Sequence, residues 1–555
     1  MEAKFLTPIQ LWKDFDPGRE ALDISYVLSD KPGGNLIKGA YITSENATDG
    51  KVRAYVETAV ADEDKKKPVI IIIGDIDSNI DRNLLEYAAG CGYYAASVDY
   101  SAYPGDTERI TRYPESYSCA TYSNAVNNLV SAEPCALNSC WFIWAKAVRR
   151  LITYLERDPL ADTKNIGVIG IRHGAVIMWQ VAATDERIKA AVSINGYESL
   201  LYSDRLKYMP SIENDLDESR VKWRAAISSE AYARFVNCPV LMVAASNNDK
   251  SSFDRIEDII KLLPEKTRYN LIFLPGLSQE ITESAVSSLK KWLNSILKKG
   301  AYPDNPSIEL ITKNNKLSVK VIADSGKKIK EAVINYSFGE INPVYRNWSQ
   351  IKMNKEEDYF ECELDVIDSE IRHFVFANII YQDNLTMSTQ QLSFIPEEFE
   401  IIPTLNVKQR IIYDTSKGID AFVTSVKELV IKDSNPHIEK SAVGINGITT
   451  SEGSLITYKI GDLRVFRETD SILQLDALTL TDKEITVVLT SEDNGVYTEY
   501  FAPVELKGGE EWSKLSFESQ DFKTAELIPL KDWQGLKKLE IRNAGNILFN
   551  NIIWV

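Results

Sequence analysis

The sequence predicts an α/β domain with a doubly wound, mostly parallel sheet in residues 1–300, followed by two all-β sandwich domains in residues 301–400 and 401–555. Three observations indicate this organisation. At 555 residues, the chain is too long for a single hydrophobic core. In the first 300 residues, runs typical of strands alternate with runs typical of helices, as in a parallel sheet with crossover helices. Beyond residues 298–306, KKGAYPDNP, almost no run is typical of a long helix.

The α/β part is expected to begin with irregular structure, followed by a hairpin whose strands are residues 36–43 and 51–59. The unbroken run of residues 68–74, PVIIIIG, predicts a strand that is buried on both faces of a parallel sheet. Residues 99–140 show no sustained periodicity of apolar residues. They are expected to form a long loop over the C-terminal edge of the sheet, where α/β proteins bind ligands. Further strands are predicted at 93–98, 164–171, 188–194, 239–245 and 270–274, and helices at 79–90, 139–157, 174–184, 215–235, 253–263 and 279–298.

The second half of the chain is expected to consist of strands. Short alternating runs suit an immunoglobulin-like or fibronectin-like sandwich in residues 301–400. Residues 395–403, IPEEFEIIP, are expected to form a linker. Strands of similar length recur from about residue 405 to the end, which predicts a jelly-roll sandwich. The strands of the first sandwich are predicted at 307–312, 316–322, 332–338, 359–364 and 373–381.

Composition and charge narrow the classes of function. A formal net charge of −17 argues against nucleic acid and anionic membrane surfaces as partners, because both bind basic surfaces. The N-terminus lacks the pattern of a secretory signal, and no apolar run approaches 18 residues. We therefore expect a cytoplasmic protein, although a mature form cut from a longer precursor stays open. With three histidines and no Cys-x-x-Cys pair, the sequence indicates no metal site and no cofactor.

Residues 164–175, KNIGVIGIRHGA, are the most informative stretch of the chain. They predict a short apolar strand, a sharp turn over residues 170–174, and a helix that begins near Ala175. This is the shape of a nucleophile elbow, in which the middle residue of G-x-S-x-G stands at the tip of a strained strand-to-helix turn. The tip here is Arg172 and not serine.

The elbow strand, together with residues 141–155 and 182–192 in the same order, resembles the α/β-hydrolase superfamily, in particular its acetyl xylan esterase and dienelactone hydrolase branch. The resemblance implies a catalytic triad of an elbow serine, an aspartate after a later strand, and a histidine after the last strand. These positions hold Arg172, Asp249 and Gln279, with Ser278 as the alternative for the last. No histidine lies between residues 174 and 372, so no shift of the match recovers the base.

The degenerate triad predicts a pseudo-hydrolase, because a guanidinium cannot attack an acyl carbon. Arg172 is expected either to form a salt bridge with Asp249 or, with His173 and Asp249, to bind an anionic ligand such as a carboxylate or a uronic sugar. His173 is interpreted as a packing or hydrogen-bonding residue, with a role as surrogate base as the alternative. The resemblance implies that the turn of residues 74–78, after the first buried strand, supplies the other oxyanion donor. Asp75 and Asp77 of this turn are interpreted as solvated residues, with metal ligands or a glycosidase pair as the alternative.

The C-terminal residues 512–517, 521–523 and 547–555 resemble a galactose-binding-like sandwich, in which aromatic rings stack on sugars. An aromatic residue in a sandwich strand is more often a core residue, which is the alternative for the aromatics of this part, Trp512, Phe517, Phe522, Trp533 and Trp554. The sequence thus favours a non-catalytic binding or scaffold protein, with carbohydrate or a small acyl or anionic ligand as partner. The alternative is an active carboxylic ester hydrolase with atypical catalytic residues. Homo-oligomerisation, or pairing with an active paralogue, stays open.

Overall fold

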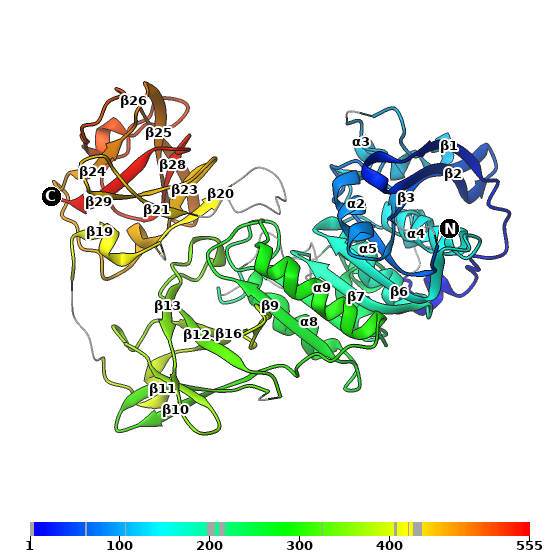
Figure 1. Cartoon of the computed structure of the whole chain (residues 1–555), viewed down its shortest axis with the longest axis horizontal. Helices are drawn as coiled ribbons and strands as arrows, with labels where there is room; N and C mark the ends of the chain where they lie inside the picture. The colour runs from blue at the N-terminus through cyan, green and yellow to red at the C-terminus, as the bar shows by residue number, and fades with distance from the viewer. Residues whose placement is uncertain are drawn as a thin grey trace. The chain divides into compact units, whose positions relative to one another are not determined.

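The computed structural model describes residues 5–61, 64–105, 107–196, 206–209, 217–324, 326–403, 408–419, 421–425 and 436–555. The chain divides into two compact units (Figure 1). The first unit comprises Met1–Ala244, Asp249–Ile272 and Ser288–Asp304. The second unit comprises Ala245–Asn248, Phe273–Ser287 and Asn305–Val555. The predicted domain boundaries near residues 300 and 400 remain predictions.

The α/β part is built on a nine-stranded sheet with the strand order β1-β2-β3-β5-β4-β6-β7-β8-β9. From β1 to β5 along this order the strands pair antiparallel, and from β5 through β4, β6 and β7 to β8 they pair parallel. Strands at the centre of a parallel sheet are buried on both faces, and β4 has this property, because its isoleucines on both faces are buried. The strands are β1 Ser25–Asp30, β2 Leu36–Ala47, β3 Gly50–Val60, β4 Lys67–Ile73, β5 Tyr94–Asp99, β6 Ala161–Ile171, β7 Ile188–Ile194, β8 Val240–Ala245 and β9 Tyr269–Leu274.

Helices cover both faces of this sheet. A Cβ atom added to Gly167 in β6 would contact Leu293 and Leu297 of α9. A Cβ atom added to Gly170 would contact Met178 of α5. Residues three apart in a strand point to opposite faces, so α9 and α5 lie on opposite sides of β6. The helices are α1 Pro8–Trp12, α2 Arg82–Gly90, α3 Tyr122–Ala125, α4 Cys140–Leu155, α5 His173–Thr184, α6 Glu218–Ala226, α7 Ser229–Ala233, α8 Ile256–Leu262 and α9 Glu283–Leu297. The predicted doubly wound sheet is confirmed.

Two elements near the N-terminus were not predicted by the sequence. Helix α1 is only five residues long, and strand β1 has an almost entirely exposed side-chain pattern with no apolar alternation. β1 is held by its antiparallel pairing with β2, which is a backbone interaction that side-chain periodicity does not report. The expected excursion at residues 99–140 contains the short helices η2 Glu115–Ala120, α3 and η3 Ala136–Asn138.

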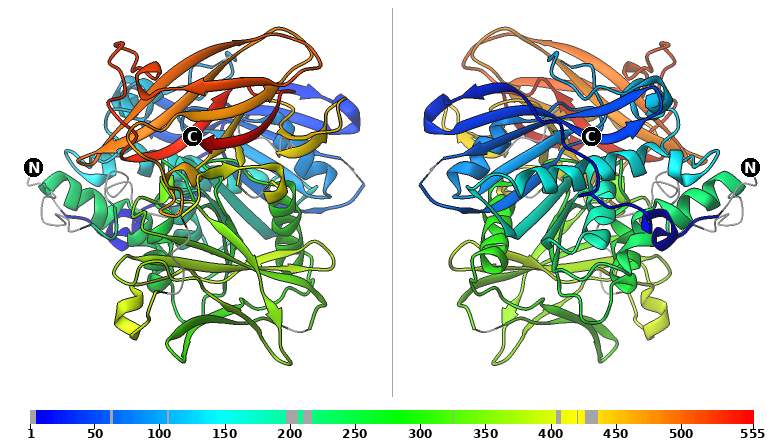
Figure 2. Two further views of the ribbon diagram at one scale, coloured as in Figure 1. Left: turned by 90° about the vertical axis from the view of Figure 1, so that its left-hand side faces the viewer. Right: turned by 90° about the vertical axis from the view of Figure 1, so that its right-hand side faces the viewer.

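The strands after residue 305 form four antiparallel sheets, which confirms the predicted all-β class (Figures 1 and 2). Two sheets have the orders β10-β11-β15-β14 and β13-β12-β16-β17, and β18 also pairs with β16. Their strands are β10 Ser307–Lys313, β11 Lys316–Ile322, β12 Ile329–Phe338, β13 Ser349–Lys352, β14 Asn354–Lys355, β15 Phe360–Glu363, β16 His373–Tyr381, β17 Thr386–Ser388 and β18 Leu392–Phe394. The five strands predicted from the sequence are all present.

The last two sheets, β21-β22-β29-β24-β27 with β19 and β20-β23-β28-β25-β26, share one hydrophobic core, as expected for a sandwich. Phe517, Phe522, Trp533 and Trp554 belong to that core. Trp512 is half-buried. The strands are β19 Ile411–Tyr413, β20 Val423–Ser425, β21 His437–Lys440, β22 Asn446–Thr449, β23 Ser454–Thr457, β24 Leu473–Leu478, β25 Lys483–Asp493, β26 Val496–Leu506, β27 Ser513–Phe517, β28 Leu536–Arg542 and β29 Leu548–Trp554.

Candidate functional site

The turn between β6 and α5 has the backbone of a nucleophile elbow. Arg172 at its tip has φ 50° and ψ −116°, a conformation that favours glycine and costs a non-glycine residue about 1–3 kcal/mol. Tight packing holds the turn in place. A Cβ atom on Gly174 would lie 2.3 Å from the carbonyl oxygen of Gly74 and 2.4 Å from that of Ile73. The elbow is therefore kept as a structure even though its tip carries no nucleophile.

The side chain of Arg172 pairs with Asp75, and not with Asp249 as one interpretation of the sequence expected. Its Nη1 lies 3.3 Å from Oδ2 of Asp75. The guanidinium is one-fifth exposed, and its buried Nε has no hydrogen-bond partner in the described part of the chain. Asp249 is exposed and forms an ion pair with Lys250 at 3.4 Å.

Asp75, in the loop after β4, is buried, which corrects its interpretation as a solvated turn residue. Its Oδ1 accepts hydrogen bonds from Nδ1 of His173 at 2.7 Å, from the backbone N–H of His173 at 3.2 Å and from that of Ile76 at 2.9 Å. Burial alone would raise the pKa of Asp75, but the hydrogen bond and charge of His173, the N–H of Ile76 and the charge of Arg172 outweigh burial and hold the pKa below its usual value. The carboxylate is therefore ionised at neutral pH.

The position of this carboxylate coincides with that of an oxyanion hole. In an α/β-hydrolase, the oxyanion accepts hydrogen bonds from the N–H of the residue after the elbow tip and from an N–H of the loop after the neighbouring strand. Here these groups are the N–H of His173 and the N–H of Ile76, after β4, which pairs with β6. Both donate to Asp75. A negative charge thus already occupies the place where negative charge develops during acyl transfer.

His173 is oriented by Asp75 as a histidine is oriented in a catalytic triad. Because Asp75 is ionised, Nδ1 of His173 carries the proton of this hydrogen bond, and in the neutral ring Nε2 is an acceptor. Nε2 has no hydrogen-bond partner among the described residues, and the side chain is 24% exposed. The ring stacks on Trp141 at a centroid distance of 6.3 Å. Such an imidazole has the geometry of a general base.

The structure brings Arg172 and His173 together with Asp75, a residue that was not predicted to take part. The carboxylate of Asp249 contacts neither Arg172 nor His173 within the described residues. Gln279 belongs to the second unit, where its backbone N–H donates to Oε2 of Glu280 at 3.0 Å. The position of Asp75, directly after the buried strand β4, is the sequence signal that could have pointed to it.

The remaining histidines are not near the elbow in the sequence and have other surroundings. His373 in β16 is fully buried and hydrogen-bonds Oη of Tyr336 and the carbonyl oxygen of Asp368. Burial lowers its pKa to about 4, so the imidazole is neutral. His437 is exposed beside Glu439. Within the described ranges, no three His, Cys, Asp or Glu side chains converge as metal ligands do, and the six cysteines are free thiols.

The sheet order, the elbow after β6 and the loop after β4 define the fold of an α/β-hydrolase. Residues 52–277 match the model of the family described as the dienelactone hydrolase family. No curated protein matches the sequence significantly. Among the helices of the described residues, none combines the length and the apolar composition needed to cross a bilayer.

Solved structures of two esterases are similar to about half of this chain. Acetyl xylan esterase 1 from Thermoanaerobacterium sp. JW/SL YS485 has 16% sequence identity and a TM-score of 0.40. The match covers 49% of this chain and 88% of that one. Acetyl xylan esterase from Paenibacillus sp. R4 has 14% identity and a TM-score of 0.39, over 51% of this chain and 91% of that one.

Proposed function

We propose that this chain is a catalytically impaired α/β-hydrolase, a pseudo-esterase that acts as a binding or scaffold protein. The observation that carries the proposal is the carboxylate of Asp75 on the two amide groups of the oxyanion position, held there by Arg172 and His173. An arginine at the elbow tip cannot form an acyl-enzyme. Loss of the triad removes a rate factor of about 10⁶, and loss of one oxyanion donor removes a factor of about 10² to 10³.

Labelling with a fluorophosphonate probe tests this proposal. The probe phosphonylates activated serines, and we expect no labelled peptide from the native chain by mass spectrometry. The variant Arg172→Ser is expected to stay unlabelled, because the position implied for the base holds Gln279 and Asp75 still fills the oxyanion position. A stoichiometrically labelled serine in the native chain would overturn the proposal.

A second candidate function is hydrolysis of carboxylic esters through His173, with a water molecule in place of the serine. The observation in its favour is the Asp75–His173 pair, which leaves Nε2 of a partly exposed imidazole without a partner among the described residues. Such a hydrolase would be a poor one, since Asp75 repels the charge that develops on the ester oxygen. This function would be identified by ester turnover in the native chain that is lost in the variant His173→Gln.

Carbohydrate is the ligand that we propose for the binding function. Four of the five aromatics expected to stack on sugars lie in the core of the C-terminal sandwich, and Trp512 alone of the five is half-buried. Binding to immobilised glycans should therefore depend on Trp512, and the variant Trp512→Ala should lose this binding.

We further propose that neither nucleic acid nor membrane is a partner, since the net charge is −17. Homo-oligomerisation and pairing with an active paralogue remain proposals for sedimentation and co-purification experiments.

A further inference from the structure

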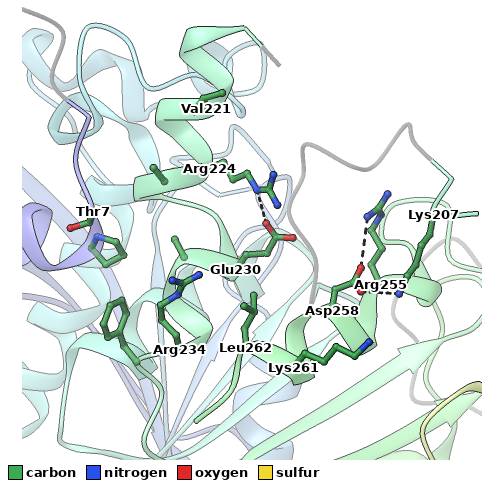
Figure 3. Close-up of a pocket in the computed structure, with 14 residues that line it drawn as sticks. Thr7, Lys207, Val221, Arg224, Glu230, Arg234, Arg255, Asp258, Lys261 and Leu262 are labelled. Atoms are coloured by element: carbon green, nitrogen blue, oxygen red, sulfur yellow. Dashed lines mark hydrogen bonds and ion pairs between the residues drawn. The ribbon is translucent and has the colours of Figure 1, made fainter. Parts of the chain in front are cut away.

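A groove on the first unit lies among helices α1, α6, α7 and α8 and has a volume of about 860 Å³ (Figure 3). This volume is in the range of pockets that hold small organic molecules. Neither Arg172 nor His173 nor Asp75 lines it, so the groove is distinct from the elbow. We call it the basic groove because five of its lining residues are cations, namely Lys207, Arg224, Arg234, Arg255 and Lys261.

The charge of the basic groove is opposite to that of the whole chain. Its lining has two carboxylates, Glu230 and Asp258, against five cations, whereas the chain carries 80 acidic and 63 basic residues. The two carboxylates are engaged by cations of the groove. Oε2 of Glu230 lies 3.0 Å from Nε of Arg224, and Oδ1 of Asp258 lies 2.8 Å from Nζ of Lys207. Lys261 is paired at 2.8 Å with Glu257, which does not line the groove. The positive charge that remains favours an anionic ligand.

Arg234 is the cation of the groove to which an anionic ligand would bind most directly. It follows the last residue of α7, is exposed, and has no hydrogen-bond or ion-pair partner among the residues that the structure describes. Figure 3 shows Arg234 among the residues that line the groove, apart from the Arg224–Glu230 pair. A guanidinium offers a planar fork of donors that matches a carboxylate or a phosphate group.

Apolar side chains also line the groove. Phe235 follows Arg234 directly and is half-buried, as is Leu262 at the end of α8. Val221 of α6 is 38% exposed. An inorganic ion would leave these groups in contact with water, whereas an organic anion with an apolar body would cover them.

We propose that the basic groove binds a small organic anion, with a carboxylate or phosphate group on Arg234 and an apolar body against Phe235, Leu262 and Val221. The groove is lined by other residues than the elbow, so this binding site is independent of whether the elbow is catalytic. The anionic group is held by charge-assisted hydrogen bonds, and the apolar body adds affinity without adding charge.

Calorimetric titration of the full chain with naphthyl phosphate, naphthoate and naphthol tests the proposal. The three probes share an aromatic body and differ in charge. We expect at least one of the two anions to bind and naphthol to bind at least roughly tenfold more weakly, with the anion's affinity falling as salt is added. The ratio between naphthyl phosphate and naphthoate then identifies which anionic group the groove prefers.

The variant Arg234→Met, which keeps much of the apolar stem, is expected to weaken binding of the anion by roughly tenfold or more. Arg220→Met is the matched control, because Arg220 lies on the neighbouring helix α6, pairs with Asp217 and does not line the groove. Circular dichroism and the melting temperature verify that both variants are folded. Absence of anion binding up to about 5 mM, equal binding of naphthol, or unchanged binding by a folded Arg234→Met would each overturn the proposal.

Discussion

At the elbow, the carboxylate of Asp75 lies against the backbone amides of His173 and Ile76 and against the guanidinium of Arg172. The carboxylate accepts three hydrogen bonds through Oδ1 and faces Nη1 of Arg172 through Oδ2. A buried carboxylate is stable only when such donors and charges compensate for its lost hydration. The same contacts explain how a permanent cation can be tolerated at the tip of a partly buried turn.

Replacing Asp75 with alanine should therefore destabilise the first unit by about 2 kcal/mol or more, because Arg172 and two amide groups lose their acceptor. Acetate or formate should restore much of the melting temperature, since a small carboxylate fits the vacated position and stabilises the fold that binds it. The measurement is thermal unfolding with and without the added anion. Asp77→Ala is the control, because Asp77 is exposed in the same loop and should change stability by less than about 0.5 kcal/mol.

The pH dependence of this effect has a definite sign. The pKa of Asp75 in the fold is below the ordinary value of 3.8, so its ionisation stabilises the fold fully above pH 3.8. That contribution is lost as the pH falls through the lowered pKa. The stability difference between the native chain and Asp75→Asn should accordingly shrink in acid. If acetate raised the melting temperatures of the native chain, Asp75→Ala and Asp77→Ala equally, the result would contradict the assigned role of Asp75.

At the scale of the elements, the elbow depends on how closely β4 approaches α5. Gly174 is the second residue of α5, and its missing side chain lets the carbonyl oxygens of Ile73 and Gly74 come close to the helix. These oxygens belong to the backbone of β4 and of the residue after it, so they cannot rotate away as a side chain can. The approach also places Asp75, the next residue, within reach of His173.

The variant Gly174→Ala should consequently destabilise the chain by about 1–3 kcal/mol, because the added methyl group overlaps the backbone oxygens. Chemical denaturation followed by fluorescence measures the effect. Gly90→Ala at the end of α2 is the matched control, since a Cβ there meets nothing within 4 Å. It should leave stability unchanged or raise it slightly. If both variants behaved alike, the close approach of β4 and α5 would not be what holds the elbow.

Elements with strong side-chain periodicity were predictable from the sequence, whereas others were not. The buried run of β4 and the apolar helix α4 carry their pattern in their own residues. Strand β1 does not, because its side chains are mostly exposed and its partner β2 supplies the pairing. The sequence order of the elbow motif likewise predicted Arg172 and His173 at the turn.

The contact partner of Arg172 was not predictable in the same way. Asp75 and Asp249 both follow strands of the sheet, and the sequence contains no local signal that distinguishes the buried carboxylate from the exposed one. The difference arises from side-chain direction in a loop, which depends on tertiary packing and not on periodicity. The resemblance already indicated where the oxyanion donors lie, but the carboxylate that occupies this position was identified only once the hydrogen bonds to Asp75 were known.

At the scale of the whole molecule, a segment that matches a hydrolase family model is followed in the same chain by four antiparallel sheets in the described residues. The first unit contains both the elbow and the basic groove, and the whole chain has a net charge of −17. These two features are the basis of our proposal that the protein binds a ligand that it does not cleave. The family fold alone does not decide this, because function depends on the site and not on the fold.

The rate of p-nitrophenyl acetate hydrolysis by the native chain, compared with free imidazole and with His173→Gln, tests the central claim most directly. If Asp75 blocks the oxyanion position, the second-order rate constant should lie within about tenfold of that of imidazole, without saturation. Saturable turnover with kcat/KM near 10⁴ M⁻¹s⁻¹ or above, lost in His173→Gln, would contradict the claim.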